Sequence, residues 1–510
     1  MRHSRKVFAG GLLLALGWIG GCRSTSGTKG SGLFTENVSS GAGSQLLSNA
    51  DGSLAKWSGV GRFRGALSCT AFWLKTSERA DAPVYALSNG HCAQEFTARE
   101  GSDTVYTNRA VTEPWTVSFG YFFDTIAQQK TVKVKQIVYS TMKRRDLAIL
   151  ELDATQGELL AAGVQPLTLA RTIPELEADI RVLGVPLLPV AEEQLYLREH
   201  LCREQGATDV VEWFWFWSQL RRNSCADIVP GSSGSPVLNA QGEVYAVINT
   251  TTRDGNSRSC YMGNPCEISS EGAVRRDDKN YAVALSGLES CWNASGVWDL
   301  SQPACPLDRR SALGVQSTTL IPNNGKDRTG EALRWNLQVT HPKPETLRYK
   351  RGLAGQVFCE DPKGYKVFKG ATDPNFSGVL PAEEGVYLVC FAEAADLSAK
   401  RVANPSTLVF TIDKTPPEGE PFINIIDAGD SVTVEPIFAV PEYSFFRIAY
   451  GPLASTDCSK AEFFPYRRFP TRVNYEELPV RYCVQGDDHA GNQGRIIERV
   501  IQRPETAKKR

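Results

Sequence analysis

The chain has 510 residues, of which 42% are apolar and 22% charged, and this composition is typical of a globular protein with roughly three or four domains. Its 56 Lys and Arg residues almost balance its 57 Asp and Glu residues, and the formal net charge of -1 excludes the diffuse basic field of a general nucleic-acid binder. Beyond the N-terminus, no apolar run reaches the roughly 18–20 residues that span a bilayer.

The N-terminus predicts an exported and lipid-anchored protein. Residues 1–6 are basic and residues 7–19 are apolar or small, as in a signal peptide. Residues 19–22, Ile-Gly-Gly-Cys, resemble the lipobox of bacterial lipoproteins. The resemblance implies that residues 1–21 are removed and that Cys22 is acylated, which anchors the protein to a lipid membrane. A plain secretory signal with an incidental cysteine is the alternative.

The residues that follow the lipobox favour the outer membrane and predict a tether. Arg23 stands where an Asp would resemble an inner-membrane retention signal. Residues 22–53 are rich in Ser, Gly, Thr and Asn and contain little apolar surface to bury. We therefore expect a flexible tether over this stretch.

Residues 54–288 contain many short apolar or alternating runs, such as Ala66–Leu74 and Val244–Ile248, separated by Gly, Pro, Asn and Asp. This pattern predicts an all-β domain with many short strands, and its length suits two packed barrels. The aromatic run Trp213–Trp217 predicts one strand with a face packed on the core. The short basic clusters, such as Lys143–Arg145, predict solvated surface.

Three segments carry the candidate chemistry. They are Ser88-Asn-Gly-His-Cys92, Arg145-Asp-Leu-Ala-Ile-Leu150 and Pro230-Gly-Ser-Ser-Gly-Ser-Pro-Val237. A serine such as Ser233 is a poor nucleophile until a base takes its proton. His91 titrates near neutrality and can act as that base, and Asp146 can hold its imidazole in the correct tautomer.

These segments resemble the chymotrypsin-like serine peptidases in motif and in the order His, Asp, Ser. The resemblance covers roughly residues 54–290 and implies that His91, Asp146 and Ser233 form a catalytic triad. It also implies a disulfide from Cys92 back to Cys69, and an oxyanion hole made by the backbone N–H groups of Gly231 and Ser233. No metal or organic cofactor is implied.

The departures from the family pattern point to its bacterial branch. Ser232 stands where digestive members carry the Asp of zymogen activation, and Ser235 replaces a Gly, and both changes match that branch. Asn89-Gly90 also replaces the common Ala-Ala before the histidine, which a turn tolerates. Asp227 lies six residues before Ser233, as does the acid that gives trypsin its basic specificity. This offset makes Asp227 a candidate substrate-binding residue for Arg or Lys at P1, although the P1 preference stays open because the loop lacks the family's intervening cysteine.

Twelve of the 13 cysteines remain once Cys22 is set aside, and the spacing does not fix their connectivity. Pairing sequence neighbours keeps every bridge inside one predicted domain. The predicted pairs are Cys69 with Cys92, Cys202 with Cys225, Cys260 with Cys266, Cys291 with Cys305, Cys359 with Cys390, and Cys458 with Cys483. None of these pairs has C-x-x-C spacing, so zinc or redox chemistry is not favoured.

Two blocks of about 100 residues follow position 310 and resemble each other. Each contains a tyrosine shortly before its second cysteine, at Tyr387 and Tyr482, which resembles immunoglobulin-like (Ig-like) sandwiches. The predicted fold is therefore all-β, with a two-barrel chymotrypsin-like peptidase domain followed by two Ig-like β-sandwich modules. The predicted boundaries are 54–310 for the peptidase domain, with a small disulfide-stapled extension at 291–305, and 311–415 and 416–503 for the modules.

These features predict a membrane-anchored serine endopeptidase that acts on proteins or peptides through an acyl-enzyme. We expect it in the bacterial cell envelope, with the peptidase domain in the periplasm or on the cell surface, and we expect no nucleic-acid partner. The oligomeric state is left open. Since every triad candidate lies before residue 240, we expect a 54–310 fragment to hydrolyse small substrates alone. The alternative is a non-catalytic surface lipoprotein that binds protein or glycan through a peptidase-like fold.

Overall fold

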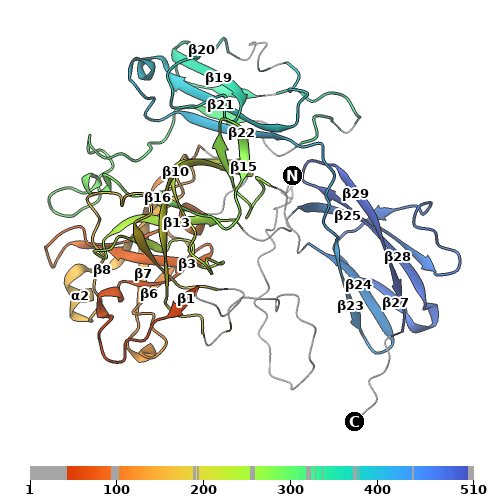
Figure 1. Cartoon of the computed structure of the whole chain (residues 1–510), viewed down its shortest axis with the longest axis horizontal. Coiled ribbons are helices and arrows are strands. Elements are labelled where there is room, and N and C mark those ends of the chain that lie inside the picture. The colour runs from red at the N-terminus through yellow and green to blue at the C-terminus, as the bar shows by residue number, and fades with distance from the viewer. Residues whose placement is uncertain are drawn as a thin grey trace, which may run out of the picture. The chain divides into compact units, whose positions relative to one another are not determined.

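The computed structural model describes residues 43–93, 103–187, 191, 194–252, 259–316, 323–327, 329–335, 337–370, 376, 378–438 and 442–503. Cys22, the predicted signal peptide and most of the predicted tether lie outside these residues. Strands dominate the described chain, as Figure 1 shows, which confirms the all-β prediction. None of the helices within the described ranges is long and apolar enough to cross a membrane.

The first barrel is built from antiparallel strands in the order β7-β6-β2-β3-β4-β8, and it closes because β8 pairs back to β7. Strand β5 adds to the outside of β7. The bounds are β2 (Val60–Arg64), β3 (Ser68–Leu74), β4 (Pro83–Ser88), β5 (Val105–Ala110), β6 (Thr116–Phe119), β7 (Lys130–Thr141) and β8 (Leu147–Thr155). Its interior is apolar and includes Phe63, Trp73 and Leu150.

The second barrel has the order β11-β16-β13-β12-β9-β10 and closes through the pairing of β10 with β11. Strands β1 and β14 also pair with β10, and β15 pairs with β14. The bounds are β1 (Ser44–Leu46), β9 (Asp179–Gly184), β10 (Arg198–Glu212), β11 (Trp215–Asn223), β12 (Pro236–Leu238), β13 (Val244–Thr251), β14 (Cys266–Ser269), β15 (Gly272–Arg275) and β16 (Asn280–Ala284). The two barrels confirm the predicted chymotrypsin-like architecture.

The two barrels pack on each other through side chains that alternate along their strands. On β3, Trp73 points into its own barrel, whereas Phe72 lies in a second core together with Leu183 and Val247 of the other barrel. Successive side chains of a strand face opposite ways, so one strand serves both cores. This shared core holds the two barrels against each other, so that loops of both barrels lie close together.

Helices are short. The described ones are α1 (Gly90–Ala93), α2 (Gln156–Ala161), η1 (Ala55–Trp57), η2 (Ile126–Gln128), η4 (Leu288–Cys291), η5 (Pro344–Thr346), η6 (Ala394–Ser398) and η7 (Tyr475–Glu477). Helix α2 begins where it does because Thr155 and Glu158 form a capping box at its N-terminus.

Six disulfides occur in the described residues, and each joins the neighbouring cysteines that the sequence pairs, so the predicted connectivity is confirmed. The bonded pairs are Cys69 with Cys92, Cys202 with Cys225, Cys260 with Cys266, Cys291 with Cys305, Cys359 with Cys390, and Cys458 with Cys483.

The bridge between Cys291 and Cys305 closes the small extension after the second barrel. This extension packs on the first barrel, since Trp298 contacts Tyr139 and its backbone N–H donates to the Tyr85 hydroxyl at 2.9 Å.

Residues beyond 310 form a sandwich that belongs to the same compact unit, which ends at Lys414. Its four-stranded sheet has the order β20-β19-β21-β22, and the pair β17-β18 packs on that sheet through one apolar core. The bounds are β17 (Gly314–Gln316), β18 (Gln338–Thr340), β19 (Leu347–Leu353), β20 (Lys366–Val367), β21 (Gly385–Glu393) and β22 (Ser406–Ile412). We call residues 311–414 the first sandwich.

The first sandwich also packs against the second barrel. Leu388 and Val409 share an apolar cluster with Val211, Phe216 and Ile268. A 54–310 fragment would therefore lose part of a core that the second barrel shares with the first sandwich. The expected activity of that fragment stays a prediction.

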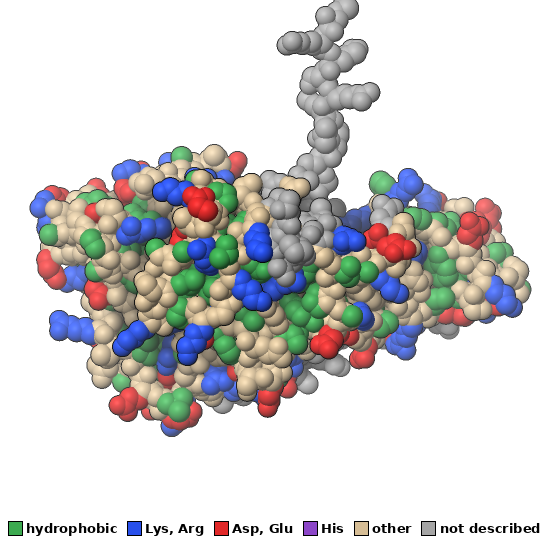
Figure 2. Space-filling model, turned by 90° about the horizontal axis from the view of Figure 1, so that it is seen from above, with side chains coloured by type: hydrophobic (Ala, Val, Ile, Leu, Met, Phe, Trp, Pro, Cys, Tyr) green, Lys and Arg blue, Asp and Glu red, His purple; other side chains and the backbone are tan. Residues whose placement is uncertain are grey.

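Residues from Thr415 onward form a second compact unit. It is a sandwich of a three-stranded sheet, β23-β24-β27, and a four-stranded sheet, β26-β25-β28-β29, with one core between them. The bounds are β23 (Phe422–Asp427), β24 (Ser431–Ile437), β25 (Tyr443–Pro452), β26 (Phe464–Pro465), β27 (Thr471–Asn474), β28 (Val480–Asp488) and β29 (Gln493–Ile501). Acidic and basic side chains are interspersed on the face that Figure 2 presents, as the near-zero net charge leads one to expect.

Candidate functional site

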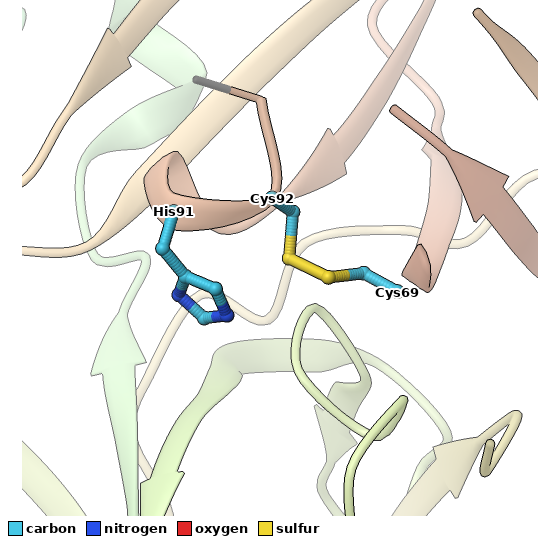
Figure 3. Close-up of side chains that lie close together, drawn as sticks. All are labelled: Cys69, His91 and Cys92. Carbon is cyan, nitrogen blue, oxygen red and sulfur yellow. A yellow bond between two sulfur atoms is a disulfide. The ribbon is translucent and has the colours of Figure 1, made fainter. Parts of the chain in front are cut away.

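His91 lies on α1, directly after β4, and a glycine allows this helix to sit close to the β7–β8 connection. A Cβ on Gly90 would lie 2.2 Å from the carbonyl oxygen of Thr141 and 3.0 Å from Oδ1 of Asp146. The imidazole is partly exposed, with 24% of the side chain accessible to solvent. Figure 3 shows the ring projecting from the helix beside the Cys69–Cys92 disulfide.

Asp146 is fully buried at the start of β8 and faces His91. Its Oδ2 lies 2.5 Å from His91 Nδ1, and its Oδ1 accepts the backbone N–H of His91 at 3.0 Å. The side-chain amide of Asn89 donates to the Asp146 carbonyl oxygen at 2.8 Å. One oxygen of the carboxylate therefore binds the imidazole of His91, and the other binds the backbone of the same residue.

The pKa of His91 is set by two opposing effects. Burial lowers the pKa, but the charge of the Asp146 carboxylate and its hydrogen bond raise it, and the net pKa lies above the usual 6.5. The imidazolium is thus stabilised, as a base that must hold a proton during a reaction requires.

Ser233 sits in a turn that only glycine can build at two positions. Gly231 has φ = 95° and Gly234 has φ = 87°. An added Cβ would lie 2.6 Å from the Leu187 backbone nitrogen at Gly231, and 2.0 Å from the Thr70 carbonyl oxygen at Gly234. The turn is fixed to the first barrel by Thr70, whose N–H donates to the Ser233 carbonyl at 2.8 Å.

Thr70 and the disulfide link the serine turn to the histidine. Thr70 follows Cys69 in β3, Cys69 is bonded to Cys92, and Cys92 follows His91. The Ser233 hydroxyl lies 3.5 Å from the Asn249 carbonyl oxygen. The structure records no hydrogen bond between Ser233 and His91, both of which it describes. In unliganded enzymes such catalytic contacts are often long and tighten when substrate binds.

The N–H groups of Gly231 and Ser233 donate to no partner among the described residues. The carbonyl groups on either side are occupied, because Pro230 accepts from the Leu187 N–H at 2.7 Å and Ser232 accepts from the Ser235 N–H at 3.0 Å. Each peptide is thereby held with its N–H pointing away from those partners. Two fixed, unpaired N–H groups beside a serine can bind a developing oxyanion.

Asp227 is half-buried, and its carboxylate contacts the N-terminal strand β1. Its Oδ2 accepts the backbone N–H of Ser44 at 3.0 Å and the Ser44 hydroxyl at 3.2 Å. These contacts occupy the carboxylate, so they do not support Asp227 as the floor of a pocket for basic side chains.

Sequence reasoning missed one buried acid at the site. Glu212, at the end of β10, accepts the Thr250 hydroxyl and the Gly263 N–H, each at 2.6 Å. Burial raises the pKa of this carboxyl, and the charge of His91 opposes that rise. Thr250 follows Asn249, the residue whose carbonyl faces Ser233, so Glu212 supports the wall beside the serine. A lone Glu next to an aromatic run gave no signal of this in the sequence.

Cys69, His91 and Cys92 have potential metal-ligating atoms within 4.8 Å of one another. The two sulfur atoms are bonded to each other, so this cluster offers no thiolate to a metal ion.

The part of the sequence that carries this arrangement matches a model of a known protein family. Residues 69–247, which include His91, Asp146 and Ser233, match the trypsin-like peptidase domain. This part of the chain is similar to a trypsin-like peptidase domain. No curated protein sequence matches the chain.

Solved structures similar to part of this chain are described as proteases or as an endopeptidase. The Rv3671c protease of M. tuberculosis, in an inactive form, is 15% identical with a TM-score of 0.29, over 45% of this chain and 85% of its own. A thermostable serine protease, AL20, from an extremophilic microorganism is 12% identical with a TM-score of 0.31, over 46% and 93%. A Glu endopeptidase in complex with MPD is 14% identical with a TM-score of 0.33, over 48% and 93%.

Proposed function

We propose that this protein is a serine endopeptidase that hydrolyses peptide bonds of proteins through a Ser233–His91–Asp146 triad and an acyl-enzyme. The observation that carries the proposal is the His91–Asp146 pair at 2.5 Å in a trypsin-like peptidase domain. Burying a carboxylate costs desolvation energy, and the two contacts to His91 offset part of that cost. Such an arrangement is typical of a site that holds one histidine in a fixed orientation.

The reaction begins when the Ser233 oxygen attacks the scissile carbonyl carbon and its proton passes to Nε2 of His91. Asp146 keeps Nδ1 protonated and stabilises the imidazolium that forms. The carbonyl oxygen becomes an oxyanion and binds the N–H groups of Gly231 and Ser233. His91 then returns the proton to the leaving amine as the C–N bond breaks.

Deacylation follows the same path with water in place of the serine. His91 takes a proton from the water, the resulting oxygen attacks the acyl carbon, and the ester bond to Ser233 breaks. The proton then returns to Ser233. The steps use the substrate, one water molecule and groups of the chain. Removal of one oxyanion donor typically costs roughly 3–4 kcal/mol of transition-state stabilisation.

A non-catalytic role is the second candidate, and one observation favours it. The Ser233 hydroxyl lies near the Asn249 carbonyl rather than in a hydrogen bond to His91. In that case the protein would be a surface lipoprotein that binds protein or glycan through its peptidase-like domain and its two sandwiches, which we propose to be Ig-like.

The lipobox-like sequence at Cys22 supports a lipid anchor, and we propose that the protein lies in the bacterial cell envelope at the outer membrane, with its peptidase domain in the periplasm or on the cell surface. Its partners would then be protein or peptide substrates near that membrane.

Peptide hydrolysis by matched variants separates the two candidate functions. Ser233→Ala is expected to fold normally and to lose at least about 10³-fold in kcat/KM, and His91→Ala is expected to behave in the same way. Ser224→Ala, an exposed serine of the same barrel, serves as the control and should keep full activity. Equal hydrolysis by Ser233→Ala and the wild type would refute the endopeptidase proposal.

A further inference from the structure

The sheet of the first sandwich is buried on both faces. Tyr387 and Val389 of β21 lie in the core of the first sandwich. Val386 and Leu388, whose side chains alternate with them, lie instead in the cluster shared with the second barrel. Ala354, which directly follows β19, and Val409 of β22 complete that side of the cluster. The first sandwich is thus docked on the peptidase domain by a continuous apolar core.

A buried group of charges lies beside this apolar cluster, with Arg144 at its centre. The guanidinium of Arg144 is 9% exposed and donates to Asp308 at 3.0 Å and to the Ala403 carbonyl at 2.5 Å. It also contacts the carboxylate of Glu360 in the first sandwich. Glu360 in turn accepts the Ser218 hydroxyl at 2.7 Å, so the same carboxylate binds both barrels.

Lys143 makes a parallel link to the first sandwich. Its ammonium group is 1% exposed and lies 3.0 Å from Asp103, and the other oxygen of Asp103 accepts the Ser406 hydroxyl at 2.7 Å. Ser406 is the first residue of β22. Two adjacent residues of one connection are therefore bound, directly or through one carboxylate, to the first sandwich.

This connection is the one that carries Asp146. β7 ends at Thr141 and β8 begins at Leu147, so five residues join them. Arg144 has φ = 57° in this connection, and its carbonyl accepts the Ser218 N–H at 2.8 Å. Both its backbone and its side chain are thus fixed, two residues before the acid that orients His91.

We propose that the first sandwich holds the Asp146 connection in its working conformation through Glu360 and Arg144. Arg144 is a positioning residue for the reaction described under "Proposed function", on which this inference rests. The physical reason is that a buried guanidinium deprived of a carboxylate partner must either move toward water or remain under-satisfied. Either response displaces the short connection between β7 and β8, in which Arg144 has a left-handed backbone conformation. A displacement of about 1 Å in a catalytic group can cost about 100-fold in rate.

The test compares Glu360→Gln with Glu345→Gln in the full-length protein. Glu345 is an exposed acid of the same sandwich whose carboxylate has no contact with the barrels among the described residues. We measure kcat and KM on a small ester, which is too short to reach the first sandwich. We also record the Nδ1 proton resonance of His91 by NMR on protein labelled with ¹⁵N-histidine, because this resonance reports the His91–Asp146 hydrogen bond without any substrate.

We expect Glu360→Gln to lower kcat at least about tenfold with little change in KM, and to shift or broaden the Nδ1 resonance, whereas Glu345→Gln changes neither. Ser218→Ala removes one hydrogen bond of Glu360 and should give a smaller change in the same direction. An unchanged kcat and an unchanged Nδ1 resonance in folded Glu360→Gln would overturn the proposal. Failure of the proposed function would look different from failure of this inference, because the wild-type protein would then show no Ser233-dependent hydrolysis. The Nδ1 resonance of His91 would still test whether Glu360 positions the connection.

Discussion

The replacement of Gly90 by alanine tests whether the close approach of α1 to the Asp146 connection matters for the chemistry. The added Cβ would lie 2.2 Å from the Thr141 carbonyl oxygen, whereas ordinary contact begins near 3.4 Å. The helix and the connection must therefore separate by about 1.2 Å, which is the difference between these two values. Overpacking of this kind costs roughly 1–3 kcal/mol of stability.

The same displacement affects the proposed triad, because Asp146 Oδ1 lies only 3.0 Å from the added Cβ. We expect Gly90→Ala to lose about 100-fold in kcat/KM on a small ester, since catalysis is sensitive to about 1 Å. The rate of covalent labelling of Ser233 by a fluorophosphonate should fall in parallel. Thermal unfolding, followed by calorimetry, separates this effect from a loss of folded protein.

Gly157→Ala is the matched control. Gly157 lies in α2, and its added Cβ would lie 3.0 Å from Ala80, which is tight but belongs to no part of the candidate site. We expect full activity from this variant. The reasoning is refuted if Gly90→Ala, folded and with a normal melting temperature, keeps the activity of Gly157→Ala.

Three further predictions concern other parts of the chain. His200 is buried, burial lowers its pKa to about 4, and its Nδ1–H donates to the Ala226 carbonyl. As the pH falls, the unfolded chain therefore takes up a proton on this histidine before the folded chain does. The free energy of unfolding is highest above pH 6.5 and decreases by on the order of 3 kcal/mol as the pH falls toward 4. In His200→Asn, urea unfolding should lose this part of its pH dependence, and an unchanged slope would contradict the assignment. Cys22→Ser should move the protein from the detergent phase to the aqueous phase in a partition experiment, and unaltered partitioning would argue against acylation. Asp227→Asn should leave the preference for the P1 residue unchanged in a peptide library, because the carboxylate binds Ser44, and a switch away from basic residues would reverse that view.

Local motifs were enough to predict the barrels and to single out His91, Asp146 and Ser233 as candidates, whereas Glu212 was missed. The turn around Ser233 needs glycine on both sides, and the acid at 146 begins a strand, so each motif is visible within a few residues. The docking of the first sandwich was missed, although β21 carried a signal for it. Its run from Val386 to Ala392 is apolar throughout, and a continuous apolar run predicts a strand buried on both faces.

Two other predictions failed because their outcome depends on distant residues. The cluster Lys143–Arg145 was expected on a solvated face, but Lys143 and Arg144 are buried. Lys143 pairs with Asp103, and Arg144 pairs with Asp308 and Glu360, all of which lie far away in the sequence. The aromatic run at 213–217 was expected as one strand. Trp213 instead has φ = 56° and begins the turn between β10 and β11. Aromatic residues have a high strand propensity. The register of the hairpin formed by β10 and β11 nevertheless places Trp213 in the turn.

Mapping the site of fluorophosphonate labelling on the full-length protein is the most direct test of the central claim, that Ser233 is a nucleophile activated by His91 and Asp146. The account predicts one adduct, located on Ser233 by mass spectrometry, which is absent in Ser233→Ala and forms much more slowly in His91→Ala. A folded wild-type protein that acquires no adduct, or that is labelled equally well in Ser233→Ala, would contradict it.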